Sequence, residues 1–175
     1  MQHHSYAGMS VYAGILDIME VRHFQDDEDG DMLDAGGGVL CQAGINDLLG
    51  IALLHTHFQL EDDETLVEGV NLDHVISMPF KLGALKASVA PMTWRFAENG
   101  AVIPIHWRID TDPKDDERIR LFMTSPAMAQ LQAILGDQIG RFGLIRISEF
   151  ERNAGGGRTL LEESDVKGRV LLSTL

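Results

Sequence analysis

Hydrophobic and polar residues alternate along this chain in patterns that predict short helices and strands in mixed order. Apolar residues recur at every third or fourth position over residues 10–24 and 126–138, which is the period of a helix with one buried face. Ser125-Pro126 is a suitable start for the second of these helices. A shorter helix is expected over residues 43–49, with Gly50 ending it.

Strand-like segments fill much of the remaining chain. Apolar runs predict strands at residues 51–60, 65–70, 74–81 and 142–150, and a terminal hairpin at residues 158–175. We expect a turn at residues 61–64 to return the first strand onto the second, and Pro79 to interrupt the third. Three helices among about eight strands indicate an α+β fold with a largely antiparallel sheet or barrel.

The clearest local signal is a hairpin over residues 92–110. Asn99-Gly100 near its centre predicts a two-residue turn, because both residue types tolerate a positive φ. In the register that this turn sets, Trp94 lies opposite Ile105, and Trp107 falls on the same face. We therefore expect both tryptophans to be buried together. The opposite, more polar face should carry Thr93, Arg95, Pro104, His106 and Arg108.

Two glycine clusters and one acidic run are interpreted as loops. The dinucleotide-binding pattern needs glycines at the first, third and sixth positions after a strand, but with Gly36 as the first position the sixth is Cys41. Residues 36–38 are therefore expected to form a flexible turn, and residues 155–157 another. The acidic run at 25–31 has the alternating carboxylates of a calcium loop, but Met32 replaces the glycine that such a loop requires.

Composition and charge indicate one globular domain and argue against polyanionic partners. The 175 residues suit one globular domain over residues 1–175, and a hydrophobic fraction of 45% argues against disorder. The formal net charge is −13, from 27 acidic and 14 basic side chains. Nucleic acids and anionic membranes attract basic proteins, so we expect this chain to bind neither.

The single cysteine, Cys41, excludes an intrachain disulfide and is typical of a reducing compartment. The first residues lack the charged and apolar regions of a signal peptide, and no apolar run approaches the length of a membrane span. These features predict a cytoplasmic protein.

The segment around His55 and His57 has a pattern that suits metal binding. Residues two apart on a strand point the same way, so both imidazoles can reach one ion. Zinc, iron and nickel accept imidazole ligands, and zinc needs three or four protein ligands. Asp62 and Glu61 are the candidates nearby for a third ligand, and His106 is the distant candidate.

This segment resembles the first signature of the cupin family over about 20 residues. The signature runs glycine, five residues, His-x-His, three or four residues, glutamate, six residues, glycine. His55 and His57 match the metal-binding pair, Asp62 stands at the glutamate position and Gly69 at the final glycine, while Gly50 is one residue too close. The second signature of the family has no counterpart in this sequence. The resemblance implies a metal held by the histidine pair.

Other interpretations of the same residues stay open. The apolar residues of the His55 strand can form its buried face while both histidines point to solvent or a polar groove. Arg95, His106 and Arg108 together suit a carboxylate or phosphate ligand, or an ordinary solvated sheet face. The sequence thus supports a small metal-binding protein or metalloenzyme acting on a small molecule. The alternative is a non-catalytic domain that binds a small ligand or a protein.

Overall fold

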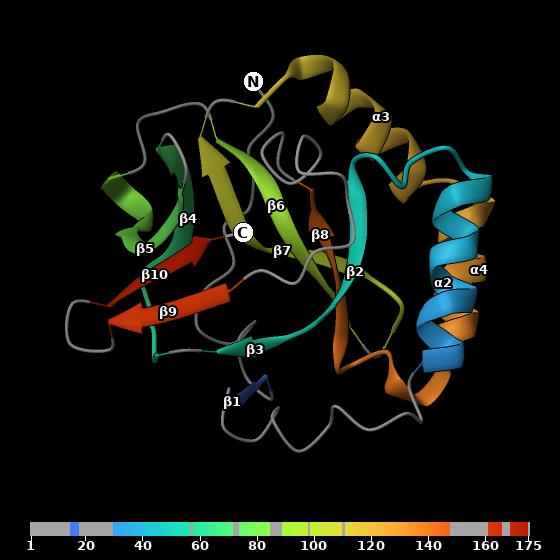
Figure 1. Cartoon of the computed structure of the whole chain (residues 1–175), viewed down its shortest axis with the longest axis horizontal. Helices are drawn as coiled ribbons and strands as arrows, with labels where there is room; N and C mark the ends of the chain where they lie inside the picture. The colour runs from blue at the N-terminus through green and yellow to red at the C-terminus, as the bar shows by residue number, and fades with distance from the viewer. Residues whose placement is uncertain are drawn as a thin grey trace.

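The structure is a computed structural model of the chain. It describes residues 15–17, 30–56, 58–71, 74–84, 89–97, 99–109, 111–147, 161–165 and 169–174. These residues form three α-helices and a mixed, mostly antiparallel sheet (Figure 1). The predicted α+β class is therefore confirmed.

The main sheet has eight strands in the order β2-β8-β6-β7-β4-β5-β10-β9. Their bounds are β2 Leu49–Leu53, β4 Glu64–Asn71, β5 His74–Lys81, β6 Val89–Phe96, β7 Val102–Ile109, β8 Phe142–Arg146, β9 Leu161–Asp165 and β10 Val170–Thr174. Neighbours pair antiparallel except β4 and β7, which are parallel. A barrel would need its first and last strands to pair. Because β2 and β9 end the order on opposite sides, the sheet is open, and the barrel alternative is wrong.

A second, two-stranded sheet joins β1 (Leu16–Asp17) to β3 (His55–Thr56) in parallel. Leu16 lies opposite His55 in this pairing. The predicted helix over residues 10–24 is therefore wrong at Leu16–Asp17, and most of that segment lies outside the described residues. Pairing with β3 overrides the helical period that the sequence shows here.

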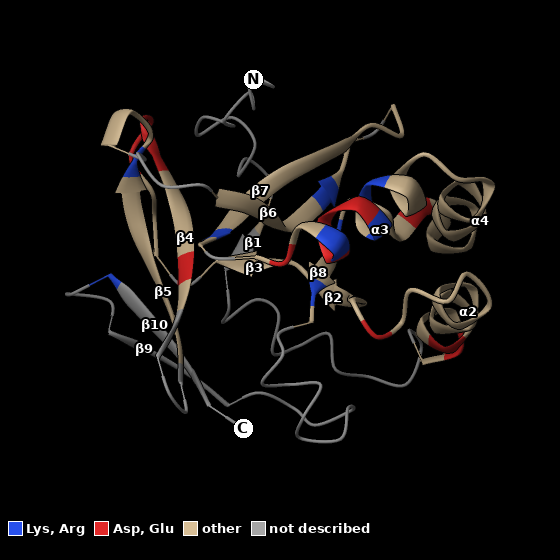
Figure 2. Cartoon of the chain, turned by 90° about the horizontal axis from the view of Figure 1, so that it is seen from above, with Lys and Arg blue, Asp and Glu red and all other residues tan. Residues whose placement is uncertain are grey.

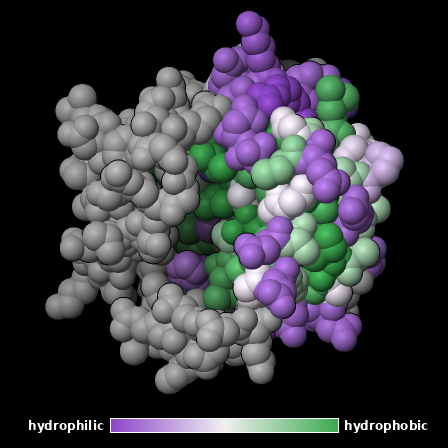
Figure 3. Space-filling view, turned by 45° about the vertical axis from the view of Figure 1, so that its right-hand side comes forward, coloured by the Kyte–Doolittle hydropathy of each residue, from purple (hydrophilic) through white to green (hydrophobic). Residues whose placement is uncertain are grey.

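Helices α2 (Gly30–Gln42), α3 (Pro113–Met123) and α4 (Pro126–Leu135) pack on the sheet near β2 and β8. Figure 1 shows α2 and α4 side by side at one end of the molecule. Apolar side chains of all three helices and of the strands β2, β6 and β8 form the larger core cluster, including Val39, Leu40, Phe122, Leu131, Leu135, Leu49, Trp94, Phe142 and Leu144. Leu131 and Leu144 are 0% exposed, and complete burial of such a side chain contributes about 1.5–3 kcal/mol. Figure 3 shows hydrophilic and hydrophobic residues interspersed on the described surface of this side.

The turn predicted at Gly36-Gly37-Gly38 is wrong, because these residues lie inside α2. A Cβ atom at Gly36 would lie 2.5 Å from the δ-methyl of Ile51 and 3.2 Å from a δ-methyl of Leu131. The missing side chain therefore lets α2 approach both β2 and α4 closely. Tertiary packing outweighs the low helix propensity of the three glycines.

Proline marks the start of the other two helices. Asp112 caps α3, and its carboxylate accepts a 2.8 Å hydrogen bond from the backbone N–H of Lys114. The predicted helix start at Ser125-Pro126 is confirmed, although the Ser125 hydroxyl donates to the Phe122 carbonyl rather than capping α4. The helix predicted at residues 43–49 is wrong, since residues 43–48 are turns that lead into β2.

The predicted hairpin forms from β6 and β7, but its register differs by one residue. Trp94 lies opposite Pro104 rather than Ile105. The N–H of Ala97 donates to Ala101 O at 2.8 Å, and the N–H of Gly100 donates to Ala97 O at 2.9 Å. Gly100 takes a φ of 78°, whereas Asn99 does not take a positive φ. The loop is thus one residue longer than the two-residue turn that Asn99-Gly100 predicted.

Both tryptophans of the hairpin are buried, as predicted, at 7% exposure for Trp94 and 1% for Trp107. They belong to separate clusters, because Trp94 joins the helix-side core and Trp107 packs with Val67 and Val89. The ladder is irregular between Pro91 and Trp94, which separates the two halves of the hairpin. Trp94 lies opposite Pro104, which is three residues from Trp107 on β7 and therefore on the other face of that strand. The shared buried face predicted for the two tryptophans is therefore wrong.

The remaining strands lie where the sequence predicted them, but some of them pair with other strands than expected. β4, β5, β8 and the terminal β9–β10 hairpin lie where strands were expected. β4 pairs with β5 and β7, so it is not the return strand of β2. Pro79 does not interrupt β5, and it lies beyond the residues of β5 that pair with β10.

Candidate functional site

The predicted metal ligand His55 begins β3 directly after the edge strand β2. Its Nδ1 lies 3.1 Å from the carbonyl oxygen of Leu53. A carbonyl only accepts, so Nδ1 is the donor of this contact. The imidazole is half-buried. Its partner in the motif, His57, lies outside the described residues.

One lysine binds two of the acidic residues in the turn that follows the histidines. Lys81 Nζ, at the end of β5, lies 2.5 Å from Glu61 Oε2 and 2.6 Å from Asp63 Oδ1. The hydrogen bonds that Lys81 donates to Asp63 and, second, to Glu61 raise its pKa well above the usual range. Asp62 is exposed between them, and it has no hydrogen-bond or ion-pair partner within the described part of the chain. Of the two acidic residues predicted as ligands, Glu61 is therefore engaged by Lys81 and Asp62 is not.

The last acidic residue of the turn, Glu64, is buried at 6% exposure. Its carboxylate accepts from the N–H of Glu61 at 2.8 Å and from both terminal nitrogens of Arg169. The Arg169 hydrogen bonds are the main reason that the pKa of Glu64 is lowered, against the opposing effect of burial. Arg169 lies directly before the last strand, β10, so this contact joins two distant parts of the chain.

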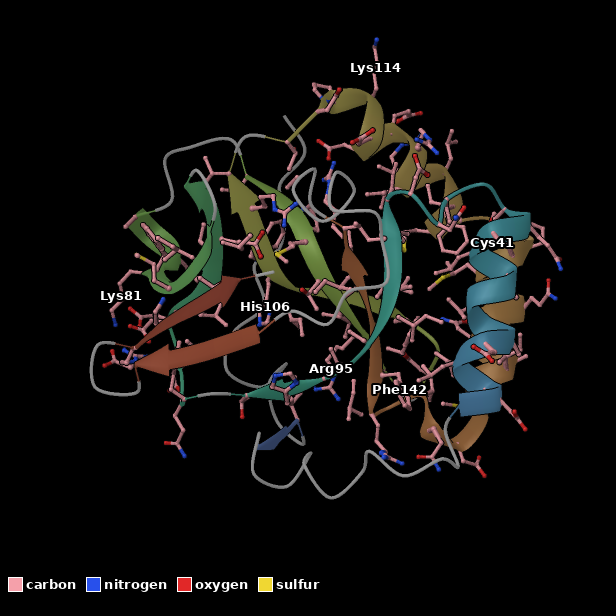
Figure 4. The ribbon with its side chains drawn as sticks, in the orientation of Figure 1. Cys41, Lys81, Arg95, His106, Lys114 and Phe142 are labelled. Carbon is pink, nitrogen blue, oxygen red and sulfur yellow. The ribbon has the colours of Figure 1, made fainter. Side chains whose placement is uncertain are left out.

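The predicted ligand-binding residues Arg95, His106 and Arg108 lie on β6 and β7. Arg108 is 7% exposed, and its Nε donates to Glu68 Oε1 of β4 at 2.6 Å, with a second, shorter contact from Nη2. This guanidinium thus neutralises a buried carboxylate that is 3% exposed. His106 lies opposite Leu66 of β4, and Arg95 lies opposite Gly143 of β8. Figure 4 shows Lys81 at the edge of the molecule far from α2, with Arg95 and His106 nearer its centre.

Within the described ranges, no group of three or more His, Cys, Asp or Glu side chains is placed to hold a metal ion. Because His57 is outside those ranges, the His55–His57 pair is not part of this result. His55, Asp62, Glu61 and His106 therefore do not form a complete site by themselves.

Three arginines outside this region each pair with a carboxylate. Arg118 Nη2 lies 2.8 Å from Asp47, Arg120 Nη2 2.6 Å from Glu117, and Arg146 Nη1 2.5 Å from Asp116. Figure 2 shows acidic and basic residues next to one another on α3. The basic side chains of this helix are thus partly neutralised rather than arranged as one basic stripe.

Sequence reasoning missed three residues of this region: Glu64, Lys81 and Arg169. The run of four acidic residues at 61–64 signals that cations are needed nearby, but it does not identify them. Lys81 is 20 residues from Glu61, and Arg169 is 105 residues from Glu64. Only the folded sheet, in which β4, β5 and β10 are neighbours, brings them together.

Comparison with protein families, with curated proteins and with solved structures finds no match to this chain. Among the helices that the structure describes, none has the length and apolar character needed to cross a bilayer.

Proposed function

We propose that this chain is a small metal-binding protein, or a metalloenzyme acting on a small molecule, in which His55, His57 and Asp62 bind one divalent transition metal. The observation that carries the proposal is the contact between His55 Nδ1 and Leu53 O. Metal-binding histidines commonly donate one ring N–H to a carbonyl, which fixes the tautomer and directs the other nitrogen to the ion. Zinc, iron or nickel suits such a donor set.

The choice of Asp62 over Glu61 follows from Lys81. A carboxylate that accepts a close ammonium hydrogen bond must give up that partner before it can bind a metal with the same oxygen. Glu61 Oε2 has such a partner at 2.5 Å, whereas Asp62 has none among the described side chains. Asp62 also occupies the carboxylate position of the cupin-like segment.

Three protein ligands would leave a fourth position around zinc for water or a substrate. A metal held by His55, His57 and Asp62 would supply Lewis-acid chemistry at that position, either activating a water or polarising a substrate carbonyl. The single cysteine is typical of a reducing compartment, so we place this function in the cytoplasm.

The proposal is tested by zinc titration calorimetry on two matched variants of neighbouring residues. D62N and E61Q each remove one negative charge from the same exposed turn. D62N should weaken zinc binding at least about 10-fold, because it replaces a charged ligand with a neutral amide. E61Q should leave affinity within about 2-fold or improve it by loosening Lys81. Equal effects of the two variants would refute Asp62 as a ligand. His3 and His4 are replaced by alanine throughout, so that the N-terminus does not supply metal ligands.

The alternative is a non-catalytic domain that binds a small ligand or a protein. Arg108 pairs with Glu68, and Lys81 pairs with Glu61 and Asp63. These pairs stabilise the fold and supply no catalytic group, which favours the alternative. The absence of zinc, iron and nickel binding by the wild-type protein would make this alternative the better account.

A further inference from the structure

Arg169 adopts a backbone conformation that its side chain disfavours. It lies directly before β10 with a φ of 53°, in the left-handed region that glycine occupies without strain. Among the described non-glycine residues, it is the one with a positive φ. A turn alone would be better served by glycine, so an arginine here indicates that its side chain makes contacts that offset the strain.

Those contacts all reach the loop between β3 and β4 or the first residue of β4, Glu64. The Nη1 group donates to Glu64 Oε1 at 3.2 Å, and the Nη2 group donates to Glu64 Oε2 and, at 2.9 Å, to the carbonyl of Gln59. The guanidinium carbon also lies 5.9 Å from the centre of the Phe58 ring. One planar group therefore holds the first, second and last residues of the segment 58–64.

This segment is the one that carries the proposed ligands. It begins directly after His57 and contains Asp62. Lys81 holds it from the β5 side through Glu61 and Asp63, but these three side chains are 48–65% exposed. The side chains of Arg169 and Glu64 are 29% and 8% exposed, so their contact is less screened by solvent than that of Lys81.

We infer that Arg169 is a positioning residue for the metal site: it fixes the segment 58–64, and with it Asp62, by tying that segment to the C-terminal hairpin. This inference rests on the proposed function. It assigns no role in coordination to Arg169. The fork of donors is essential, because a lysine ammonium cannot bind both oxygens of Glu64 in the plane of its carboxylate while also bonding the Gln59 carbonyl.

The test measures zinc affinity by competition with a chromogenic chelator, using R169G, R169K and a control, R118A. R169G removes the guanidinium and relieves the backbone strain, so it keeps the turn. R118A removes another partly exposed arginine that is paired with a carboxylate, Asp47. We expect R169G and R169K to lose about 10–100-fold in affinity, as when a group that orients a metal ligand is removed. R118A should stay within about 2-fold of the wild type.

Two further readouts separate positioning from general stability. Guanidinium ion at low millimolar concentration should restore part of the affinity of R169G, and it should not affect R118A. The visible spectrum of the cobalt-loaded protein should change in R169G, because a displaced ligand alters the coordination geometry.

Unchanged zinc affinity in R169G, or an equal loss in R118A, would overturn the inference while leaving the proposed function in place. A wild-type protein that binds no zinc would refute both.

Discussion

The three consecutive glycines of α2 give a sharp test of how this helix packs. Gly36 faces β2 and α4, whereas a Cβ atom at Gly37 or Gly38 would have no neighbour within 4 Å. Replacing glycine by alanine inside a helix stabilises it by about 0.5–1 kcal/mol when the new methyl group meets nothing. G37A and G38A should therefore each raise the free energy of unfolding by about that amount.

G36A has the same backbone gain and an added steric cost. Its methyl group would lie 2.5 Å from the δ-methyl of Ile51, and 3.2 Å from a δ-methyl of Leu131. Overpacking a core by one carbon costs about 1–3 kcal/mol. The lower part of that range applies, because both contacts are ends of side chains that can rotate. We expect G36A to be about 1–2 kcal/mol less stable than G37A.

Urea denaturation of the three variants, monitored by circular dichroism and tryptophan fluorescence, measures these differences. The slopes of the transitions should agree, so that midpoints report stability alone. A G36A variant as stable as G37A and G38A would refute the close packing of α2 on β2. Destabilisation by all three substitutions would refute a helix at this position.

Three further predictions concern buried groups. R108A should lower the free energy of unfolding by about 3–5 kcal/mol, because it leaves Glu68 buried without its partner, and the R108M/E68M double variant should recover most of that loss in the same urea experiment. W107A should cost about 3–5 kcal/mol, since Trp107 is 1% exposed, whereas L121A at a 54% exposed site should change stability by about 0.5 kcal/mol or less. Because Arg169 lowers the pKa of Glu64 below its ordinary value of 4.5, the stabilisation from Glu64 is complete above pH 4.5 and is lost as pH falls through the lowered pKa. The stability difference between wild type and E64Q should therefore shrink below pH 4.5, and a difference that grows on acidification would contradict the Arg169–Glu64 contact.

Local sequence signals predicted the elements whose stability is local. Ser125-Pro126 starts a helix, and Asn99-Gly100 lies at a hairpin loop, because caps and turns depend on a few adjacent residues. Asp112-Pro113 carries the same signal as Ser125-Pro126 and would have predicted α3. The exact hairpin register was not predictable from the turn, since Gly100 suits a longer loop equally well.

The features that the sequence did not predict depend on packing between distant segments. Gly36-Gly37-Gly38 has the composition of a turn, but the space left at Gly36 is filled by Ile51 and Leu131. The Glu68–Arg108 pair depends on the parallel pairing of β4 with β7, which connects residues 40 apart. In the candidate site, His55 and the acidic turn were found from their spacing. The two cations that bind carboxylates of that turn are distant in sequence: Lys81 ends β5, and Arg169 lies directly before β10.

Metal content tests the central claim most directly. Wild-type protein without an affinity tag, with His3 and His4 replaced and purified without chelator, should contain about one zinc, iron or nickel ion per chain by elemental analysis. The H55A/H57A variant, prepared in parallel and shown to be folded, should contain less than a tenth of that amount. Equal metal content in the two preparations, or no metal in wild-type protein after incubation with each ion and gel filtration, would contradict the account.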